Sequence, residues 1–146
     1  MRAARAGLLA AVLVLAALAA CSAGTLSQWV ASSGVESNNA QLRSDIGDLE
    51  NGIRLRELLP LRTACEAFSA DASTADGVLP SPDTALTDEL NTAYQDFYVA
   101  GADCFGAKSF ASADYRRFLS RLAAGRAELG RASELLRRLL GRGGGG

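Results

Sequence analysis

Hydrophobic residues recur at intervals of three and four along most of the chain after residue 34, which is the repeat of one face of an α-helix. The repeat predicts helices over about residues 35–55, 84–106 and 111–140, and another that begins near residue 58 and fades within 71–77. No stretch alternates hydrophobic and polar residues for long enough to predict a half-buried strand. Four helices joined by short connections most simply form an antiparallel four-helix bundle, so we predict an all-α fold.

The positions expected to face the core share this spacing. They are Leu42, Ile46, Leu49 and Ile53; Leu58, Leu61, Cys65, Phe68 and Ala72; Leu86, Leu90, Ala93, Phe97, Gly101 and Cys104; and Tyr115, Phe118, Leu122, Gly125, Leu129, Ala132, Leu136 and Leu139. In the last group large and small residues interleave, which allows a neighbouring backbone to approach closely. A short amphipathic stretch over 25–33 precedes a break near Gly34, and the prolines of the loop 77–82 block helix formation.

The first twenty residues have the pattern of a secretory signal. Two arginines lie within residues 1–5, and the fourteen residues of 7–20 are uncharged and rich in Leu, Ala and Val. A helix needs about twenty hydrophobic residues to cross a bilayer. A basic start followed by a short hydrophobic segment and small residues therefore predicts a signal peptide over residues 1–20.

The end of this segment allows two cleavage sites. Ala17-Leu18-Ala19 fits an ordinary signal peptidase, which would release a soluble product. Leu18-Ala19-Ala20-Cys21 instead resembles a bacterial lipobox. That resemblance implies cleavage between Ala20 and Cys21 and a diacylglyceryl group on the Cys21 sulfur, and two acyl chains anchor a protein stably. We therefore expect a lipid anchor at Cys21 on the extracytoplasmic face of the cell membrane.

Three cysteines are present, and a lipid on Cys21 leaves Cys65 and Cys104 as an even pair. Both lie on the inward faces of predicted helices, in a chain expected to be exported to an oxidising compartment. This favours a structural disulfide, although two free buried thiols would fit the same positions. The expected organisation is a signal peptide over 1–20, a lipidated stalk over 21–34, a helical domain over 35–141 and a Gly-rich tail over 142–146.

The mature sequence resembles small exported lipoproteins of high-GC Gram-positive bacteria of the actinobacterial type. The matching elements are Ala64-Cys65, Pro80-Ser81-Pro82-Asp83, Ala102-Asp103-Cys104 and Gly125-x3-Leu129, and the single lysine, Lys108, among many arginines fits a GC-rich genome. The resemblance implies a cell-envelope lipoprotein, and it transfers no activity and no functional residues to this chain.

Composition argues against catalysis. The chain has no histidine, which is the usual base near neutral pH, and a disulfide would leave no free thiol in the helical domain. The acidic groupings Asp45 with Asp48 and Asp88 with Glu89 lack the ligand spacing and glycine of a calcium loop. We therefore predict no catalytic residues, no metal and no cofactor.

Charge is distributed unevenly. Residues 21–115 carry fourteen acidic and five basic side chains, whereas residues 116–146 carry eight arginines and two acids. A basic last helix can pair with acidic neighbours in exposed ion pairs, each worth under about 1 kcal/mol. Alternatively, its arginines meet an envelope protein or an anionic wall or lipid surface. The arginines that would contact such a partner or surface are Arg116, Arg117, Arg121, Arg137, Arg138 and Arg142. Export excludes nucleic acid as a partner.

Two functions fit these features. The first is a non-catalytic helical domain that binds or scaffolds another envelope component. The alternative is a carrier of a small molecule or lipid in a pocket between the helices, lined by aromatic residues. The aromatic residues concerned are Trp29, Tyr94, Phe97, Tyr98, Phe105, Phe110, Tyr115 and Phe118.

Overall fold

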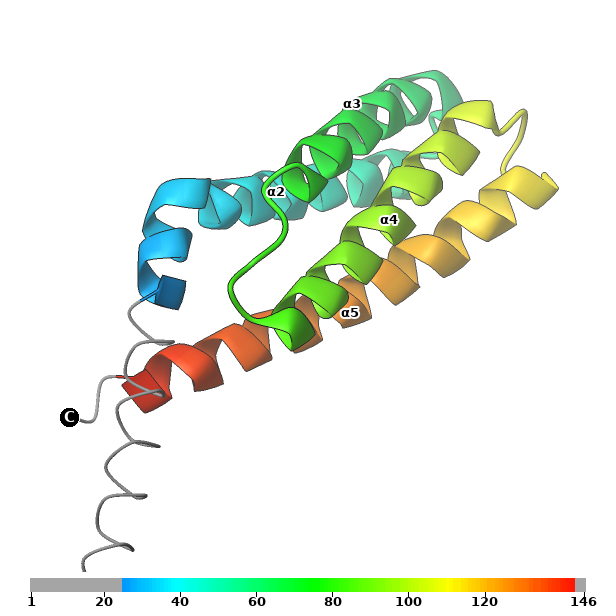
Figure 1. Cartoon of the computed structure of the whole chain (residues 1–146). Coiled ribbons are helices and arrows are strands. Elements are labelled where there is room, and N and C mark those ends of the chain that lie inside the picture. Colours follow the sequence, from blue (N-terminus) through cyan, green and yellow to red (C-terminus); the bar gives the residue numbers. More distant parts are fainter. Residues whose placement is uncertain (1–24, 144–146) are drawn as a thin grey trace, which may run out of the picture.

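The computed structural model describes residues 25–143, and these residues form helices and no strand. Residues 25–33 form a short helix. It is followed by α2 (Val35–Leu55), α3 (Leu58–Asp76), α4 (Thr84–Gly106) and α5 (Ala113–Gly143) (Figure 1). The all-α prediction is confirmed, and the helices lie close to the positions that the hydrophobic repeat gave. The expected signal peptide, Cys21 and residues 144–146 lie outside the described residues.

Local sequence explains where the helices begin and end. Gly34 separates the first helix from α2 with a φ of +80°, a left-handed conformation that costs glycine little. Asp83 caps α4, because its carboxylate accepts a hydrogen bond of 2.8 Å from the backbone N–H of Leu86. At the other end of the chain α5 continues to Gly143, so residues 142 and 143 of the expected flexible tail are helical. Extending an existing helix costs far less than starting one, which accounts for this difference.

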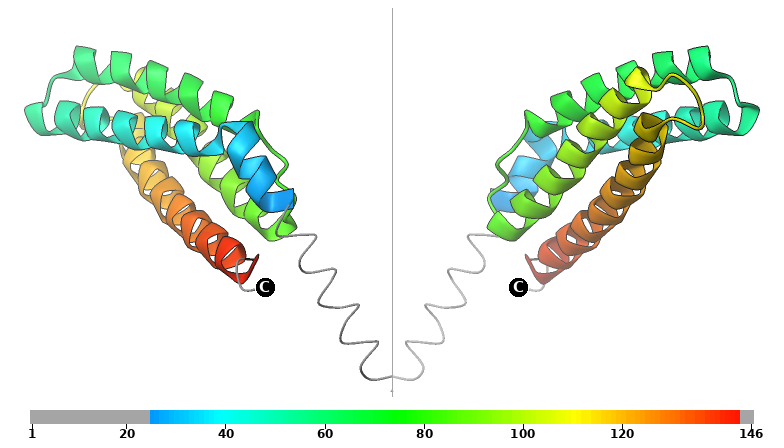
Figure 2. Two further views of the ribbon diagram at one scale, coloured as in Figure 1. Left: turned by 90° about the vertical axis from the view of Figure 1, so that its left-hand side faces the viewer. Right: turned by 90° about the vertical axis from the view of Figure 1, so that its right-hand side faces the viewer.

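The helices pack in chain order, α2 against α3, α3 against α4 and α4 against α5. The connections between them lie at alternating ends of the molecule (Figure 1). The first described helix and the last turns of α5 lie at the same end in all views (Figure 1, Figure 2). Towards that end α2 and α5 diverge, so the two outer helices of the series do not cover each other along their full length (Figure 2).

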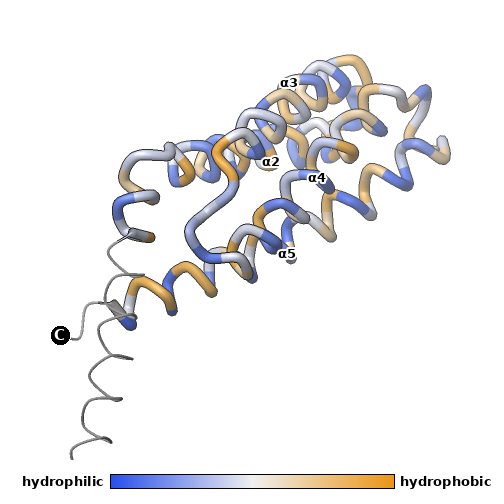
Figure 3. Tube along the Cα trace, in the orientation of Figure 1, coloured by the Kyte–Doolittle hydropathy of each residue, from blue (hydrophilic) through white to orange (hydrophobic). Residues whose placement is uncertain are grey.

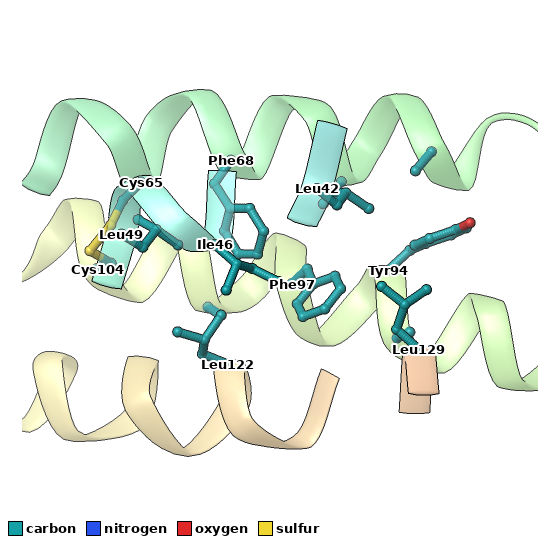
Figure 4. Close-up of a cluster of buried hydrophobic side chains, with 14 of the residues drawn as sticks. Leu42, Ile46, Leu49, Cys65, Phe68, Tyr94, Phe97, Cys104, Leu122 and Leu129 are labelled. Atoms are coloured by element: carbon teal, nitrogen blue, oxygen red, sulfur yellow. A yellow bond between two sulfur atoms is a disulfide. The ribbon is translucent and has the colours of Figure 1, made fainter. Parts of the chain in front are cut away.

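Large hydrophobic side chains from all four long helices meet in one core (Figure 4). The ring centroids of Phe68 on α3 and Phe97 on α4 are 5.1 Å apart. Every position predicted to face inward on α4 is buried, and so are those on α5 as far as Ala132. Leu26 is also buried, so the described part of the expected stalk packs with the domain. Leu136 and Leu139 are only half-buried, because the end of α5 lies outside the main core.

Candidate functional site

Cys65 and Cys104 form a disulfide between α3 and α4, with their Cα atoms 5.8 Å apart. Both residues are fully buried (Figure 4). The pairing expected from the cysteine count and the helix faces is therefore confirmed. A buried, paired cysteine is neither a nucleophile nor a metal ligand, so this pair is structural.

The aromatic residues do not line an enclosed cavity together. Tyr94, Phe97 and Phe118 are fully buried and fill the core, whereas Tyr98 and Phe105 are 47% and 45% exposed. The hydroxyl of Tyr94 donates a hydrogen bond of 2.8 Å to Oδ1 of Asn39 on α2. Burial raises the pKa of Tyr94 well above its ordinary value. Tyr94 therefore links α4 to α2 as a neutral hydrogen-bond donor.

Most arginines of α5 pair with acidic side chains. Arg131 lies 3.3 Å from Glu89, Arg121 lies 3.0 Å from Asp96 and Arg117 lies 3.2 Å from Asp103, all measured from nitrogen to oxygen. Along α4 the paired acidic residues run from Glu89 to Asp103, while their arginine partners on α5 run from Arg131 back to Arg117. Further ion pairs join Arg117 to Asp114, Arg126 to Glu50, Arg131 to Glu128 and Arg137 to Glu134. These pairs fit the interpretation of the basic helix as a partner for acidic neighbours.

Three of the arginines expected to meet an anionic surface form no ion pair among the described residues: Arg116, Arg138 and Arg142. Arg116 donates a hydrogen bond to the carbonyl of Ala111 at the start of α5. Arg138 and Arg142 are exposed in the last two turns of the same helix. The six arginines therefore differ, and within residues 25–143 only the two near the end of α5 have neither an acidic nor a carbonyl partner.

One member of the acidic groupings noted in the sequence, Asp45, is a buried carboxylate. Asp45 is buried on α2, where Nε2 of Gln41 donates a 2.8 Å hydrogen bond to Oδ1. Its Oδ2 has no hydrogen-bond partner among the described residues. Burial raises the pKa of Asp45, and the nearby carboxylates of Asp71 and Asp48 raise it further. In the described part of the chain no group of three or more Asp, Glu or Cys side chains is placed to hold a metal ion.

A groove of about 310 Å³ lies between α2 and α5. Polar side chains cross it at two points, where Arg126 pairs with Glu50 and Arg43 donates a 3.4 Å hydrogen bond to the hydroxyl of Ser133. Its remaining lining is hydrophobic or small: Ile46, Gly47, Leu129 and Gly130. We call this set of eight residues the α2–α5 groove.

Two glycines keep this groove open. A Cβ atom built on Gly47 or on Gly130 would meet no atom within 4 Å, and neither residue has a positive φ. Glycine inside a helix costs about 1 kcal/mol relative to alanine. Neither position therefore requires glycine for packing or backbone geometry, although each one lowers the stability of its helix.

Sequence reasoning did not identify the groove, because only Ile46 and Leu129 of its lining were predicted core positions and the other six residues lie beside them. The one sign of the groove in the sequence is a glycine within a helical repeat that lies away from the hydrophobic face. Gly125 illustrates the contrast, since a Cβ there would lie 2.6 Å from ring atoms of Phe97. Glycine at 125 is explained by packing, and glycine at 47 and 130 is not.

Comparison of the chain with protein-family models, with curated proteins and with solved structures finds no match. Among the described helices none is long and hydrophobic enough to cross a membrane.

Proposed function

We propose that this chain is a lipid-anchored protein on the extracytoplasmic face of the cell membrane, whose helical domain binds another component of the cell envelope without catalysing a reaction. The anchor is the diacylglyceryl group expected on Cys21, after cleavage behind Ala20. The short hydrophobic segment before Cys21, the lipobox pattern and the disulfide between the two remaining cysteines all support export.

The scaffold of this function is an antiparallel four-helix bundle formed by α2, α3, α4 and α5. The alternating ends of the connections support this arrangement (Figure 1). The order of the ion pairs supports it as well, since Glu89 meets Arg131 while Asp103 meets Arg117. A rigid bundle with a buried disulfide keeps α2 and α5 at a fixed separation, as a binding groove requires.

The observation that carries the binding function is the α2–α5 groove, held open by Gly47 and Gly130. Both glycines weaken their helices, and neither relieves a steric conflict. The groove has a hydrophobic lining between two polar contacts, the Arg126–Glu50 ion pair and the Arg43–Ser133 hydrogen bond. Protein interfaces combine a hydrophobic core and a polar rim in a similar way. The proposed ligand is a segment of another envelope protein that places small hydrophobic side chains against Ile46 and Leu129.

The alternative function, a carrier of a small molecule or lipid, has less support. A carrier requires a cavity that covers most of the ligand surface. The aromatic side chains proposed to line such a cavity are divided between the filled core and the exposed surface. The pocket beside Tyr94 and Tyr98 is an open surface hollow of about 150 Å³. We therefore place the binding function on the outer groove.

The anchor is tested by intact-mass analysis of the native product. We expect a mature chain that begins at Cys21 and carries the added mass of a diacylglyceryl group. A Cys21→Ala variant should appear in the culture medium or accumulate as uncut precursor. A native chain cleaved after Ala19, with no added lipid, would contradict the membrane anchor and leave the groove proposal standing.

The groove is tested by site-specific photo-crosslinking in intact cells. A photoreactive side chain at position 130 should capture one discrete partner, whereas the same side chain at position 106 should not. Gly106 is the matched control, because a Cβ atom there also meets nothing within 4 Å. A second substitution, Gly47→Leu, should fill the groove and remove the crosslink from position 130. Equal crosslinking at both positions, or a crosslink unaffected by Gly47→Leu, would contradict the proposed binding site.

A further inference from the structure

The last two turns of α5 carry basic and hydrophobic residues on one face. Leu135, Arg138, Leu139 and Arg142 follow the spacing of residues that are neighbours on a helix surface. Both leucines are half-buried and both arginines are exposed. In Figure 3 hydrophobic and hydrophilic residues alternate along these turns. A helix face with this combination is typical of proteins that lie on an anionic membrane surface.

This face lies beyond the acidic side chains of α4. Arg131 pairs with Glu89, which is only five residues after the first residue of α4. The turns of α5 that follow Leu136 therefore extend past the start of α4 (Figure 1). Glu134 is the last acidic residue of α5, and it pairs with Arg137. The charges of Arg138 and Arg142 are thus not balanced by an acidic partner in the described part of the protein.

The first described helix lies at the same end of the molecule as the last turns of α5 (Figure 1). Residues 25–33 contain no charged side chain, and Trp29 and Val30 within them are half-buried. Tryptophan favours the boundary between lipid and water. The short helix and the last turns of α5 lie at the same end of the molecule (Figure 1, Figure 2). We call this end the membrane-facing end and define it by Trp29, Val30, Leu135, Arg138, Leu139 and Arg142.

The position of the proposed anchor brings this surface to the bilayer. Four residue steps separate Cys21 from Thr25, and an extended chain spans at most about 3.5 Å per residue. Whatever conformation these residues adopt, the first described helix begins within roughly 14 Å of a lipidated Cys21. The end of the protein with unbalanced arginines is thus the end held near the lipid headgroups.

We infer that the membrane-facing end docks on the anionic lipid surface to which the chain is anchored, so that the α2–α5 groove is presented at a fixed orientation to the membrane. This inference rests on the proposed lipid anchor. Arg138 and Arg142 bind lipid phosphates, while the exposed parts of Leu135, Leu139 and Trp29 lie at the headgroup level and their remaining parts pack against the protein core. Arg117, Arg121 and Arg126, which pair with acidic side chains, take no part in docking.

Trp29 is the only tryptophan of the chain, and its fluorescence reports on docking directly. The lipidated mature protein is reconstituted into vesicles of phosphatidylcholine alone or mixed with phosphatidylglycerol, with brominated acyl chains as quenchers. We expect stronger quenching of Trp29 in the anionic vesicles, and a loss of this difference at high salt. Each arginine should shift the ratio of docked to undocked protein by about fivefold.

The variant Arg138→Glu/Arg142→Glu should reduce quenching in anionic vesicles to the level seen with phosphatidylcholine. The matched control is Arg54→Glu/Arg116→Glu, which makes the same charge change at exposed positions at the other end of the molecule. Circular dichroism should show equal helix content and equal melting for both variants.

Quenching that is equal in both vesicle types, or unchanged by Arg138→Glu/Arg142→Glu, would overturn the inference while leaving the anchor intact. Quenching lost only in the control variant would also overturn it, since this outcome places the end that carries the exposed Leu59 on the membrane. A native product without lipid, seen by mass analysis, would instead contradict the proposed anchor.

Discussion

Gly101 on α4 lies directly against the backbone of Cys65 on α3: a Cβ atom added at Gly101 would be 2.8 Å from the Cys65 carbonyl oxygen. It would also lie 2.9 Å from the backbone nitrogen of Ser69. The absence of a side chain at 101 thus allows α3 and α4 to approach closely. The disulfide between Cys65 and Cys104 lies one helical turn away, so glycine and disulfide together set the spacing of this helix pair.

Replacing Gly101 with alanine should destabilise the protein. Overpacking costs about 1–3 kcal/mol, and the helix propensity of alanine offsets up to about 1 kcal/mol of it. Two of the three nearest atoms belong to backbone and the third is the Cβ of Ser69, so none of them can move aside as the end of a flexible side chain can. Urea unfolding should show a lower midpoint for Gly101→Ala and a slightly higher one for Gly47→Ala, whose Cβ has open space. Equal midpoints for the two variants would mean that the helix spacing adjusts freely.

The disulfide should contribute a large part of the stability. Its two cysteines are 39 residues apart in sequence, and the chain-entropy model gives about 4 kcal/mol for closing such a loop in the unfolded state. Cys65→Ala/Cys104→Ala should therefore lower the free energy of unfolding by about this amount. Urea unfolding of the oxidised, reduced and double-variant proteins measures the effect. A loss under about 1 kcal/mol would show that the reduced chain remains constrained by other contacts.

The helices were predictable because each one carries a clear hydrophobic face. Leu42, Ile46 and Leu49 predicted the buried side of α2, and all three are buried. Cys65 and Cys104 were expected on inward helix faces. A disulfide between them was expected because the third cysteine, Cys21, was assigned to lipidation. The hydrophobic repeat predicts which face of a single helix is buried, and this prediction requires no knowledge of how the helices pack together.

The groove and the buried polar groups were not predictable, because they depend on how helices meet. Gly47 and Gly130 are 83 positions apart in the sequence and line one groove only because α2 and α5 diverge. Asn39 lies one turn before Leu42 on the same face, but its role depends on the Tyr94 hydroxyl from α4. The distinction between paired and unpaired arginines on α5 likewise depends on the positions of acidic residues on α2 and α4.

The hydrogen bond between Tyr94 and Asn39, which links α4 to α2, should contribute to stability. Tyr94→Phe removes the donor and leaves the buried Asn39 Oδ1 without its partner, at a cost of about 1–3 kcal/mol. Tyr98→Phe is the matched control, since Tyr98 lies one turn later and is half exposed. Thermal melting of both variants compares the two sites. If Tyr98→Phe lowers the melting temperature as much as Tyr94→Phe, the buried hydrogen bond contributes nothing measurable.

Asp45 should make stability depend on pH in the direction opposite to a salt-bridged carboxylate. Its pKa is raised in the folded protein, chiefly by burial and further by Asp71 and Asp48, from an ordinary value of 3.8. Between the two pKa values the folded state holds a proton that the unfolded chain has lost. The contribution of Asp45 is therefore fully present below pH 3.8 and is lost as pH rises through the raised folded pKa.

Asp45→Asn should remove this dependence, because the amide stays neutral and its oxygen still accepts the hydrogen bond from Gln41. The difference in unfolding free energy between variant and parent should favour the variant near neutral pH and shrink as the pH falls. Urea unfolding over a series of pH values measures that difference, in which the contributions of carboxylates that do not interact with Asp45 cancel. Glu36→Gln removes one negative charge from an exposed position of α2 that does not contribute to the raised pKa of Asp45, and it should show a flatter profile. A difference for Asp45→Asn that does not change with pH would mean that this carboxylate remains charged in the folded protein.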